Sequence, residues 1–426
     1  MKIFITIARL IVGSLFIVSG LIKCNDSIGF SYKLDDYFAA DVLNLEFLIP
    51  YSLGLAVIIC VVEVVLGVAL LFGLKSKLTT SLVLLMMLFF TWLTWYTSNC
   101  LHNQEIAAQL GEEFSKNCVT DCGCFGDALK LKPIESFYKD LFLLVFTIPL
   151  FFAAFKRTIT ENKPKQDVFY IAASLLLILA FGVFVIGWWF TVLFSLVLFS
   201  IVFLVKNKLK NQWVTLLSAY SIAMAFTWYC LQHLPIKDFR PYKIGANIPE
   251  SMIYPEDAPK PIQEFTWKFK VDGEIKEFVT SGSYPEVDGE YVGVVSKVID
   301  EGYEPPIKDF SIESDTGNLT DQYMEVEKLL MIVSYNINNA DKEGLGTLKT
   351  VSDLAIKNGY TVVGITASGN SEKETLKNNK NLDFEFYLGD EKALKTIIRS
   401  NPGYLILNKG TIKQKAHWND VDKLKF

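Results

Sequence analysis

Residues 117–145 read NCVTDCGCFGDALKLKPIESFYKDLFLLV, and this stretch joins a cluster of cysteines to a long apolar segment. Cys118, Cys122 and Cys124 fall within seven positions, and the apolar run begins at Phe137. Such a cluster could hold a metal, carry a disulfide or fix a loop. The choice depends on whether the apolar run crosses a membrane and on which side the cysteines lie, because the compartment decides whether thiols stay reduced.

The composition indicates a membrane protein. The chain has 426 residues, of which 51% are hydrophobic, and its mean hydropathy is +0.30. Soluble domains are rarely this apolar. The net charge of −5 argues against nucleic acid as a partner. With only three histidines, a His-rich metal site is not expected, and we predict no bound metal.

Seven stretches are apolar enough for a helix of about 20 residues to cross the hydrocarbon core. They are Ile3–Ile22, Tyr51–Gly73, Leu78–Ser98, Phe137–Phe155, Val168–Ile186, Trp188–Val205 and Trp213–Leu231. The fifth and sixth stretches are continuous, and one helix over both would far exceed a bilayer. We therefore expect the chain to turn at Gly187-Trp188-Trp189.

Basic residues predict the orientation of the spans. The connections between spans two and three, four and five, and six and seven carry Lys75, Lys77, Lys156, Arg157, Lys163, Lys165, Lys206, Lys208 and Lys210. Positively charged loops stay in the cytoplasm, so the N-terminus is expected inside. Residues 23–50, 100–132 and everything after Leu231 are then outside. Lys23 directly follows the first span, which lacks a clear cleavage site, so we expect a retained helix rather than a signal peptide.

Six of the seven cysteines are expected at the outer membrane surface. They are Cys24, Cys100, Cys118, Cys122, Cys124 and Cys230, whereas Cys60 lies inside a span. Three interpretations remain open. Cys100–Cys118 could staple the loop, with Cys122 or Cys124 bonded to Cys24 or to each other. The four loop cysteines could bind zinc, although zinc sites favour C-x(2–4)-C pairs and reduced thiols. Finally, Cys122 and Cys124 could be a labile redox pair, with Cys100 and Cys118 as a relay.

Two charges inside the spans are expected to meet. Arg9 in the first span and Glu63 in the second lie at similar depths, so we predict that they form an ion pair. Its expected role is to orient two helices rather than to catalyse a reaction.

The segment after the last span reads as a soluble α/β unit. The expected elements are a hairpin over 264–279 turning at Asp272-Gly273, a hairpin turning near 315–317, strands over 328–335 and 360–367, helices over 347–357 and 391–400, a strand or loop over 384–390, and a final strand pair turning at Lys409-Gly410. Strand–helix–strand order followed by a hairpin predicts an α/β sheet.

The membrane part resembles a known family. ARLIVGSLFIVSGLIKC (8–24), EVVLGVALLFGLKSK (63–77) and CGCFGDALKLKPIESFYKDLFLL (122–144) resemble the DoxX-like superfamily, and its MauE (methylamine utilisation) type in particular. The resemblance covers about residues 1–155. It implies a four-helix membrane bundle, to which this chain adds about three spans, and a link to maturation of a disulfide-rich periplasmic enzyme.

Two further likenesses bear on cofactor and source. The bundle is similar to the membrane part of vitamin K epoxide reductases, which pass electrons from cysteines to a quinone. This chain lacks their CxxC in the fourth helix, so we expect no cofactor, with a quinone as the weaker alternative. With YCLQHLPIKDFRPYKIGANIPE (229–250) and its soluble tail, the chain looks like a Bacteroidetes-type DoxX protein.

The soluble tail resembles thioredoxin-like domains of the periplasmic TlpA type. IKDFSIESDTGNLT (307–320) looks like the N-terminal hairpin of that fold, and SNPGYLILNKGTI (400–412) like its cis-proline strand, with Pro402 as the proline. The family's CxxC position falls in Ser334–Glu343, which contains no cysteine. The domain is therefore expected to be inactive as a thioredoxin. We expect a groove formed by Pro402, Tyr335 and Asn336 to bind a partner.

These observations combine into one expected organisation. The predicted units are a transmembrane bundle (1–156), further spans (157–235), a periplasmic linker with a β-hairpin (236–300) and a thioredoxin-like domain (301–426). The expected setting is a bacterial inner membrane, with periplasmic or envelope proteins and the lipid bilayer as partners. The expected function is thiol–disulfide redox chemistry or maturation of envelope proteins, with Cys100, Cys118, Cys122 and Cys124 as catalytic candidates. The alternative is a non-enzymatic scaffold, or a subunit of an envelope complex, with structural disulfides.

Overall fold

The computed structural model describes residues 2–110, 114, 116–260, 262–271, 273–300 and 302–426. Within them, seven helices are long and apolar enough to cross a membrane, which confirms the seven predicted spans. They are α1 (Lys2–Asn25), α3 (Ser52–Phe72), α4 (Ser76–Leu110), α5 (Pro133–Phe155), α6 (Pro164–Leu179) with its continuation η3 (Ala180–Val185), α7 (Phe190–Leu209) and α8 (Gln212–Gln232). The chain turns between η3 and α7 at Gly187, whose φ is +69°, as predicted.

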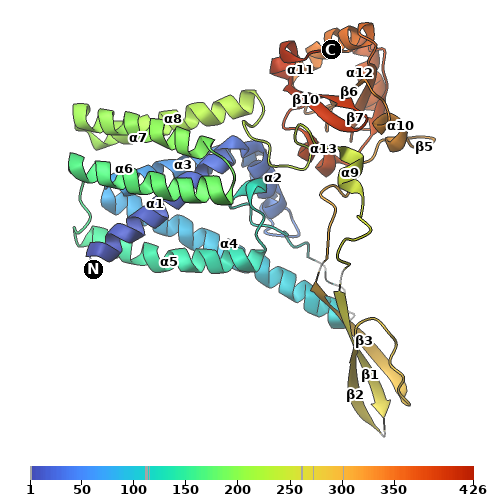
Figure 1. Ribbon diagram of the computed structural model, residues 1–426, viewed down its shortest axis with the longest axis horizontal. Coiled ribbons are helices and arrows are strands. Elements are labelled where there is room, and N and C mark those ends of the chain that lie inside the picture. The colour runs from blue at the N-terminus through green and yellow to red at the C-terminus, as the bar shows by residue number, and fades with distance from the viewer. Residues whose placement is uncertain (1, 111–113, 115, 261, 272, 301) are drawn as a thin grey trace.

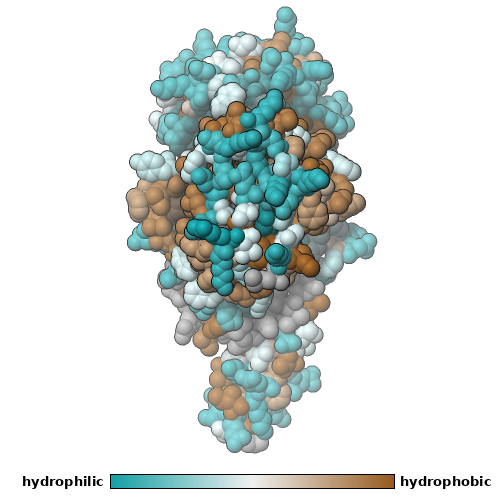
Figure 2. Space-filling view, turned by 90° about the vertical axis from the view of Figure 1, so that its left-hand side faces the viewer, coloured by the Kyte–Doolittle hydropathy of each residue, from teal (hydrophilic) through white to brown (hydrophobic). Residues whose placement is uncertain are grey.

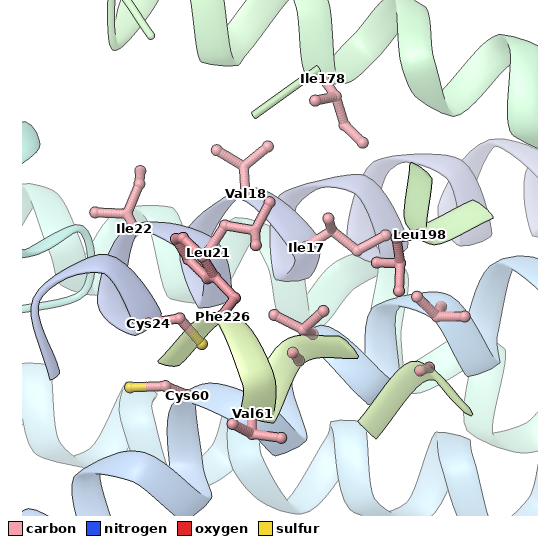
Figure 3. Packing of buried hydrophobic residues seen from close by; sticks show 14 of the residues in the cluster. Ile17, Val18, Leu21, Ile22, Cys24, Cys60, Val61, Ile178, Leu198 and Phe226 are labelled. Atoms are coloured by element: carbon pink, nitrogen blue, oxygen red, sulfur yellow. The ribbon is translucent and has the colours of Figure 1, made fainter. Parts of the chain in front are cut away.

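Helices α1 and α3 cross closely at the centre of the bundle. A Cβ atom on Gly67 would lie 2.7 Å from the carbonyl oxygen of Gly13, and one on Gly20 would lie 2.7 Å from the side chain of Val64. Small residues let two membrane helices bring their backbones together, so that packing and dispersion hold them. The crossing fixes the register of α1 against α3. Figure 3 shows the apolar side chains that fill the space around it, among them Ile17, Leu21 and Val61.

This register corrects the predicted pair between Arg9 and Glu63. The guanidinium of Arg9 donates instead to the carbonyl oxygens of Leu70 and Leu71, each at 2.9 Å. Glu63 pairs with Lys23, whose Nζ lies 2.5 Å from Glu63 Oε2. The two helices are antiparallel with Gly13 opposite Gly67. Arg9 therefore reaches the last turn of α3, whose carbonyl groups lack partners within the helix, while Lys23 lies beside the middle of α3.

The end of the bundle that carries Arg9 is closed by a buried polar network. Arg9 also donates to Asn162 Oδ1 at 2.9 Å and to the hydroxyl of Tyr170 at 3.0 Å. Lys206 of α7 pairs with Asp167 of α6 at 2.6 Å. Figure 2 shows this end of the molecule, with hydrophilic residues gathered over the middle and apolar residues on both flanks. The network ties the added spans to α1 and α3.

We call the opposite end, where the C-terminal residues lie, the domain end (Figure 1). Here the chain forms a helix within a predicted loop, α2 (Ser27–Phe38), followed by the 3-10 helix η1 (Glu46–Tyr51). The side chain of Asp26 caps α2 by accepting a hydrogen bond from the backbone N–H of Gly29 at 2.9 Å. Helix α4 runs past the predicted end of its span and reaches a three-stranded sheet (Figure 1).

That sheet contains β1 (Ile262–Val271), β2 (Glu274–Thr280) and β3 (Glu290–Asp300) in the order β2-β1-β3, all antiparallel. The predicted hairpin over 264–279 is therefore formed by β1 and β2. Its predicted turn includes Asp272, which lies outside the described residues. Strand β3 was not predicted.

The C-terminal unit contains a seven-stranded mixed sheet with helices packed on it. Its strand order is β10-β9-β6-β7-β8-β4-β5, in which β6 runs parallel to β7 and antiparallel to β9. The strands are β4 (Glu313–Ser314), β5 (Gly317–Asn318), β6 (Leu329–Val333), β7 (Thr361–Thr366), β8 (Phe386–Leu388), β9 (Gly403–Asn408) and β10 (Thr411–His417); the helices are α9 (Ile248–Met252), α10 (Thr320–Met324), α11 (Lys342–Lys357), α12 (Asn370–Lys380) and α13 (Glu391–Ile397). This confirms the predicted alternation of strands and helices. The peptide bond before Pro402 is cis, as expected.

The close crossing of α1 and α3 leads to a prediction. Gly67→Leu should lower the free energy of unfolding by about 1–3 kcal/mol, because its side chain has no room against α1. Gly54→Leu on the same helix is the matched control, since a Cβ atom there meets nothing within 4 Å. Thermal unfolding in detergent measures both variants. Equal melting temperatures for the two would contradict the crossing.

Candidate functional site

Cys122 and Cys124 form a thiol pair at the domain end of the bundle. Their sulfur atoms lie 2.9 Å apart in a hydrogen-bond contact, and both cysteines are free rather than disulfide-bonded. Cys122 Sγ lies 3.0 Å from the hydroxyl oxygen of Ser136 in the first turns of α5. Ser19 of α1 donates to the carbonyl oxygen of Cys124 at 3.0 Å. The pair is thus held between two membrane helices. Gly123, between the two cysteines, has the left-handed conformation (φ +65°) that glycine adopts readily.

The surroundings give the two thiols different acidities. A hydrogen bond from Cys124, another from Ser136 and the positive charge of Lys139 together lower the pKa of Cys122, although burial opposes them. The same sulfur–sulfur contact and burial raise the pKa of Cys124. These opposite shifts favour a thiolate on Cys122 over one on Cys124. A thiolate is the nucleophile of disulfide chemistry.

The structure assigns the other predicted cysteines to different places. Cys100 and Cys118 form a disulfide that joins α4 to the loop, so this pair is the structural disulfide that was one of the three interpretations. With two of its four ligands bonded to each other, the alternative zinc site is not formed. Among the described residues, no three His, Cys, Asp or Glu side chains gather as metal ligands. Cys24 is a free thiol that approaches Cys60 between α1 and α3 (Figure 3), rather than a partner of Cys122 or Cys124.

The C-terminal unit contacts the cysteine loop (residues 116–132) through Arg399. Its guanidinium donates to both carboxylate oxygens of Asp26, at 2.9 and 3.1 Å, and lies 3.5 Å from Asp127, three residues after Cys124. Burial alone would raise the pKa of Asp26, but the charge and hydrogen bonds of Arg399 lower it overall. One arginine therefore connects the C-terminal unit, the start of α2 and the loop.

The groove expected to bind a partner is covered by the chain itself. The hydroxyl of Tyr32 on α2 donates to that of Tyr335 at 3.1 Å, and their rings meet edge to face. Pro402 is buried, and a Cβ atom on Gly344 of α11 would lie 2.8 Å from its ring. The backbone oxygen of Asn336 accepts from Asn401 Nδ2 at 2.8 Å. The three predicted residues therefore make contacts within the chain, where the prediction placed an external partner.

Three residues of this site, Asp26, Arg399 and Ser136, were not predicted from the sequence. Asp26 and Arg399 are 373 positions apart, and no local pattern links them. Ser136 lies in the first turns of α5 beside Glu135 and Lys139, so its residue type alone did not distinguish it.

The comparisons with known proteins bear on the membrane part. Residues 1–103 match the family model of the methylamine utilisation protein MauE. No curated protein and no solved structure gives a match. The matched residues cover α1, α2, α3 and most of α4, and the match ends before Cys122 and Cys124. With its seven apolar helices, the chain is a multi-pass membrane protein similar to MauE over that range.

The charge of Lys139 leads to a prediction about Cys122. Lys139→Met should raise the pH at which the Cys122 thiolate forms by about one unit, because it removes a nearby positive charge. Thiolate absorbance, corrected with Cys122→Ser, gives the midpoint. Lys130→Met is the control, since Lys130 is exposed and pairs with Asp127 at 3.7 Å. Identical midpoints in the wild type and Lys139→Met would contradict the assignment.

The contacts of Arg399 lead to a prediction about the stability of the cysteine loop. Arg399→Ala should lower the free energy of local opening of the cysteine loop by about 1–3 kcal/mol, because it leaves Asp26 without its buried partner. Hydrogen exchange of residues 119–130 should become faster in that variant. Lys392→Ala, which changes an exposed side chain on α13, should leave this exchange unchanged. If both variants behave like the wild type, Arg399 does not hold the loop.

Proposed function

We propose that this chain is a membrane thiol–disulfide exchange protein in which Cys122 and Cys124 are the exchanging pair. The observation that carries the proposal is the 2.9 Å contact between two free thiols, one with its pKa lowered, in a loop clamped between α1, α5 and the C-terminal unit. Buried structural cysteines ordinarily have raised pKa values and are inert. A scaffold with only structural disulfides accounts less well for this free pair.

The chemistry follows from the two acidities. As a dithiol, the pair attacks a client disulfide through the Cys122 thiolate. One client sulfur leaves with the electron pair, and Cys124 then displaces the client from the mixed disulfide. The client gains two electrons and the pair becomes a disulfide. The reverse sequence oxidises a client dithiol, so the direction depends on the relative reduction potentials.

The proposed setting is the outer side of a bacterial inner membrane. The three basic connections lie at the end opposite the cysteine loop, which supports placing the loop and the C-terminal unit in the periplasm. Client proteins would be periplasmic or envelope proteins. A disulfide such as Cys100–Cys118 suits an oxidising compartment.

The proposed role of the C-terminal unit is to hold and cover the cysteine loop. Its strand order and the alternation of strands and helices support a thioredoxin-like fold. Residues 334–343 contain no cysteine, so this unit contributes no nucleophile. Arg399 and Tyr335 would position the unit on the membrane part.

A trapping experiment tests the proposal. Full-length Cys124→Ser protein in detergent is mixed with a synthetic peptide that contains one disulfide. Cys122 should form a stable mixed disulfide with the peptide, because the residue that resolves it is absent. Wild-type protein should instead release reduced peptide. Mass mapping identifies the adduct.

Cys60→Ser is the control, because Cys60 is a buried thiol inside α3. This variant should reduce the peptide as the wild type does. If Cys124→Ser forms no adduct at Cys122 and the wild-type protein leaves the peptide oxidised, the proposed function is wrong.

A further inference from the structure

A large polar groove, which we call the outer groove, lies at the domain end of the bundle. Its volume is about 1140 Å³, and its walls come from α4, the cysteine loop, residues 304–309 and α13. Helix α4 and the C-terminal unit, which includes α13, diverge from this end of the bundle (Figure 1). Sites for small molecules usually measure about 300–1,000 Å³, so the outer groove is larger than a small ligand needs.

The outer groove leads to the thiol pair. Thr120 and Asp121 line the groove and directly precede Cys122 in the chain. The same two residues line a second cavity of about 410 Å³, the inner cleft, which reaches Gly123. Because Gly123 lies between the two cysteines, the groove and the inner cleft together reach the backbone of the thiol pair.

The other side of the cysteine loop offers a polypeptide no approach. An almost wholly apolar cavity of about 310 Å³ lies there among the membrane helices, and Cys124 forms part of its wall. A polypeptide that entered this cavity would leave its backbone N–H and C=O groups without hydrogen-bond partners, which is unfavourable. A polypeptide client therefore has to approach the loop from the outer groove.

The lining of the outer groove suits a polypeptide of mixed sequence. Four acidic and four basic side chains line it, so its charge does not select a phosphate-bearing ligand. Among the residues that the structure describes, the side chains of His102, Glu105 and Asp309 line the groove and make no hydrogen bond or ion pair. They are available to hydrogen-bond the backbone and the polar side chains of a bound segment.

The walls of the outer groove are fixed before any client binds. The disulfide between Cys100 and Cys118 joins α4, one wall of the groove, to the cysteine loop, which is its floor. Pro305 and Pro306 line another wall, and proline has a fixed φ angle. A binding surface that is ordered beforehand loses little conformational entropy when a ligand binds.

We propose that the outer groove binds an extended segment of a client polypeptide and presents the disulfide of that segment to Cys122. The inference rests on the proposed thiol–disulfide function and names the surface that selects its substrate. The substrate is then a polypeptide rather than a small thiol compound. The disulfide between Cys100 and Cys118 holds the α4 wall in position and takes no part in the electron transfer.

The test compares two substrates that carry the same disulfide, using full-length Cys124→Ser protein in lipid nanodiscs. The first is an unstructured peptide of about twelve residues, long enough to occupy a groove in extended form, whose central cysteine is disulfide-bonded to mercaptoethanol. The second is N-acetylcysteine amide with the same disulfide. In both, the Cys122 thiolate attacks the cysteine sulfur and mercaptoethanol leaves as a thiolate.

The expected result is a difference in rate. The peptide should form its adduct at Cys122 about tenfold faster or more, because contacts along the outer groove hold it beside the thiolate during the same chemical step. Mass mapping measures the adduct over time. The ratio of the two rates is the readout, because it cancels any change in the reactivity of Cys122 itself.

Variants of α4, made in the same protein, test the groove itself. His102 and Glu105 line it about one helical turn apart. His102→Trp combined with Glu105→Trp should lower the ratio of the two rates to about two or less, because the two rings fill the space of the peptide. Asn103→Trp combined with Gln104→Trp is the matched control, since these exposed neighbours do not line the groove, and should keep the original ratio. Thermal unfolding shows that each variant is folded.

Hydrogen exchange gives a second measurement that needs no tryptophan variant. Residues 98–105 and 303–310 should exchange more slowly in the peptide adduct than in the adduct with N-acetylcysteine amide, because only the peptide covers the outer groove. Residues 212–232 of α8, which do not line the groove, should exchange alike in both adducts.

The outcomes separate the two proposals. If Cys122 reacts with both substrates at equal rates, the groove does not select a polypeptide, and the proposed function stands without it. If the folded groove variant keeps the ratio of its control, or if the peptide protects other residues instead, the peptide binds elsewhere and the inference is overturned. Exchange of residues 98–105 that slows with protein concentration alone would mean that a second copy of the chain fills the groove, which also overturns it. If Cys122 reacts with neither substrate, both proposals fail.

Discussion

The glycine crossing of α1 and α3 is the constraint on which the rest of the structure depends. Because Gly13 and Gly67 bring the two backbones together, the depth of every polar residue on α1 is fixed against α3. Arg9 then meets the end of α3, Lys23 meets Glu63, and Ser19 meets the backbone of Cys124. One packing contact between small residues thus positions a buried network at one end of the bundle and a thiol pair at the other.

At the domain end, three parts of the chain that are distant in sequence converge on one loop. Helix α5 contributes Ser136 and Lys139, α1 contributes Ser19, and the C-terminal unit contributes Arg399. The contact with Cys124, the hydrogen bond with Ser136 and the charge of Lys139 lower the pKa of Cys122, whereas burial alone would have the opposite effect, and Ser19 and Arg399 hold the loop in place. The C-terminal unit lacks a thiol of its own, and its contacts with α2 and the loop connect it to the thiol pair of the membrane part.

The sequence predicts elements better than it predicts their contacts. The apolar runs gave all seven spans, and the turn before Trp188 followed from the length of a bilayer. Strands and helices of the C-terminal unit followed from alternation and turn residues. Helix α2 and the extension of α4 were missed because polar helical segments carry weak patterns once they leave the apolar core. Strand β3 was missed although its sequence, EYVGVVSKVID, is rich in β-branched residues.

The candidate site was predicted only in part. The spacing of Cys122 and Cys124 marked them as a pair, but the sequence left three interpretations of the loop open. The ion pair between Arg9 and Glu63 was wrong because depth along one helix does not determine the register against another. Tertiary packing produces the hydrogen bonds of Arg399 to Asp26 and the apolar cavity lined by Cys124. A single sequence holds no local signal for either of them.

The redox state of the four loop cysteines in living cells tests the central claim most directly. Acid-quenched alkylation followed by mass mapping measures each of them. Cys100 and Cys118 should be fully bonded to each other, whereas Cys122 and Cys124 should be divided between thiol and disulfide and should shift toward the thiol with added reductant. A single oxidised connectivity of all four cysteines, unchanged by mild reductant, would contradict it.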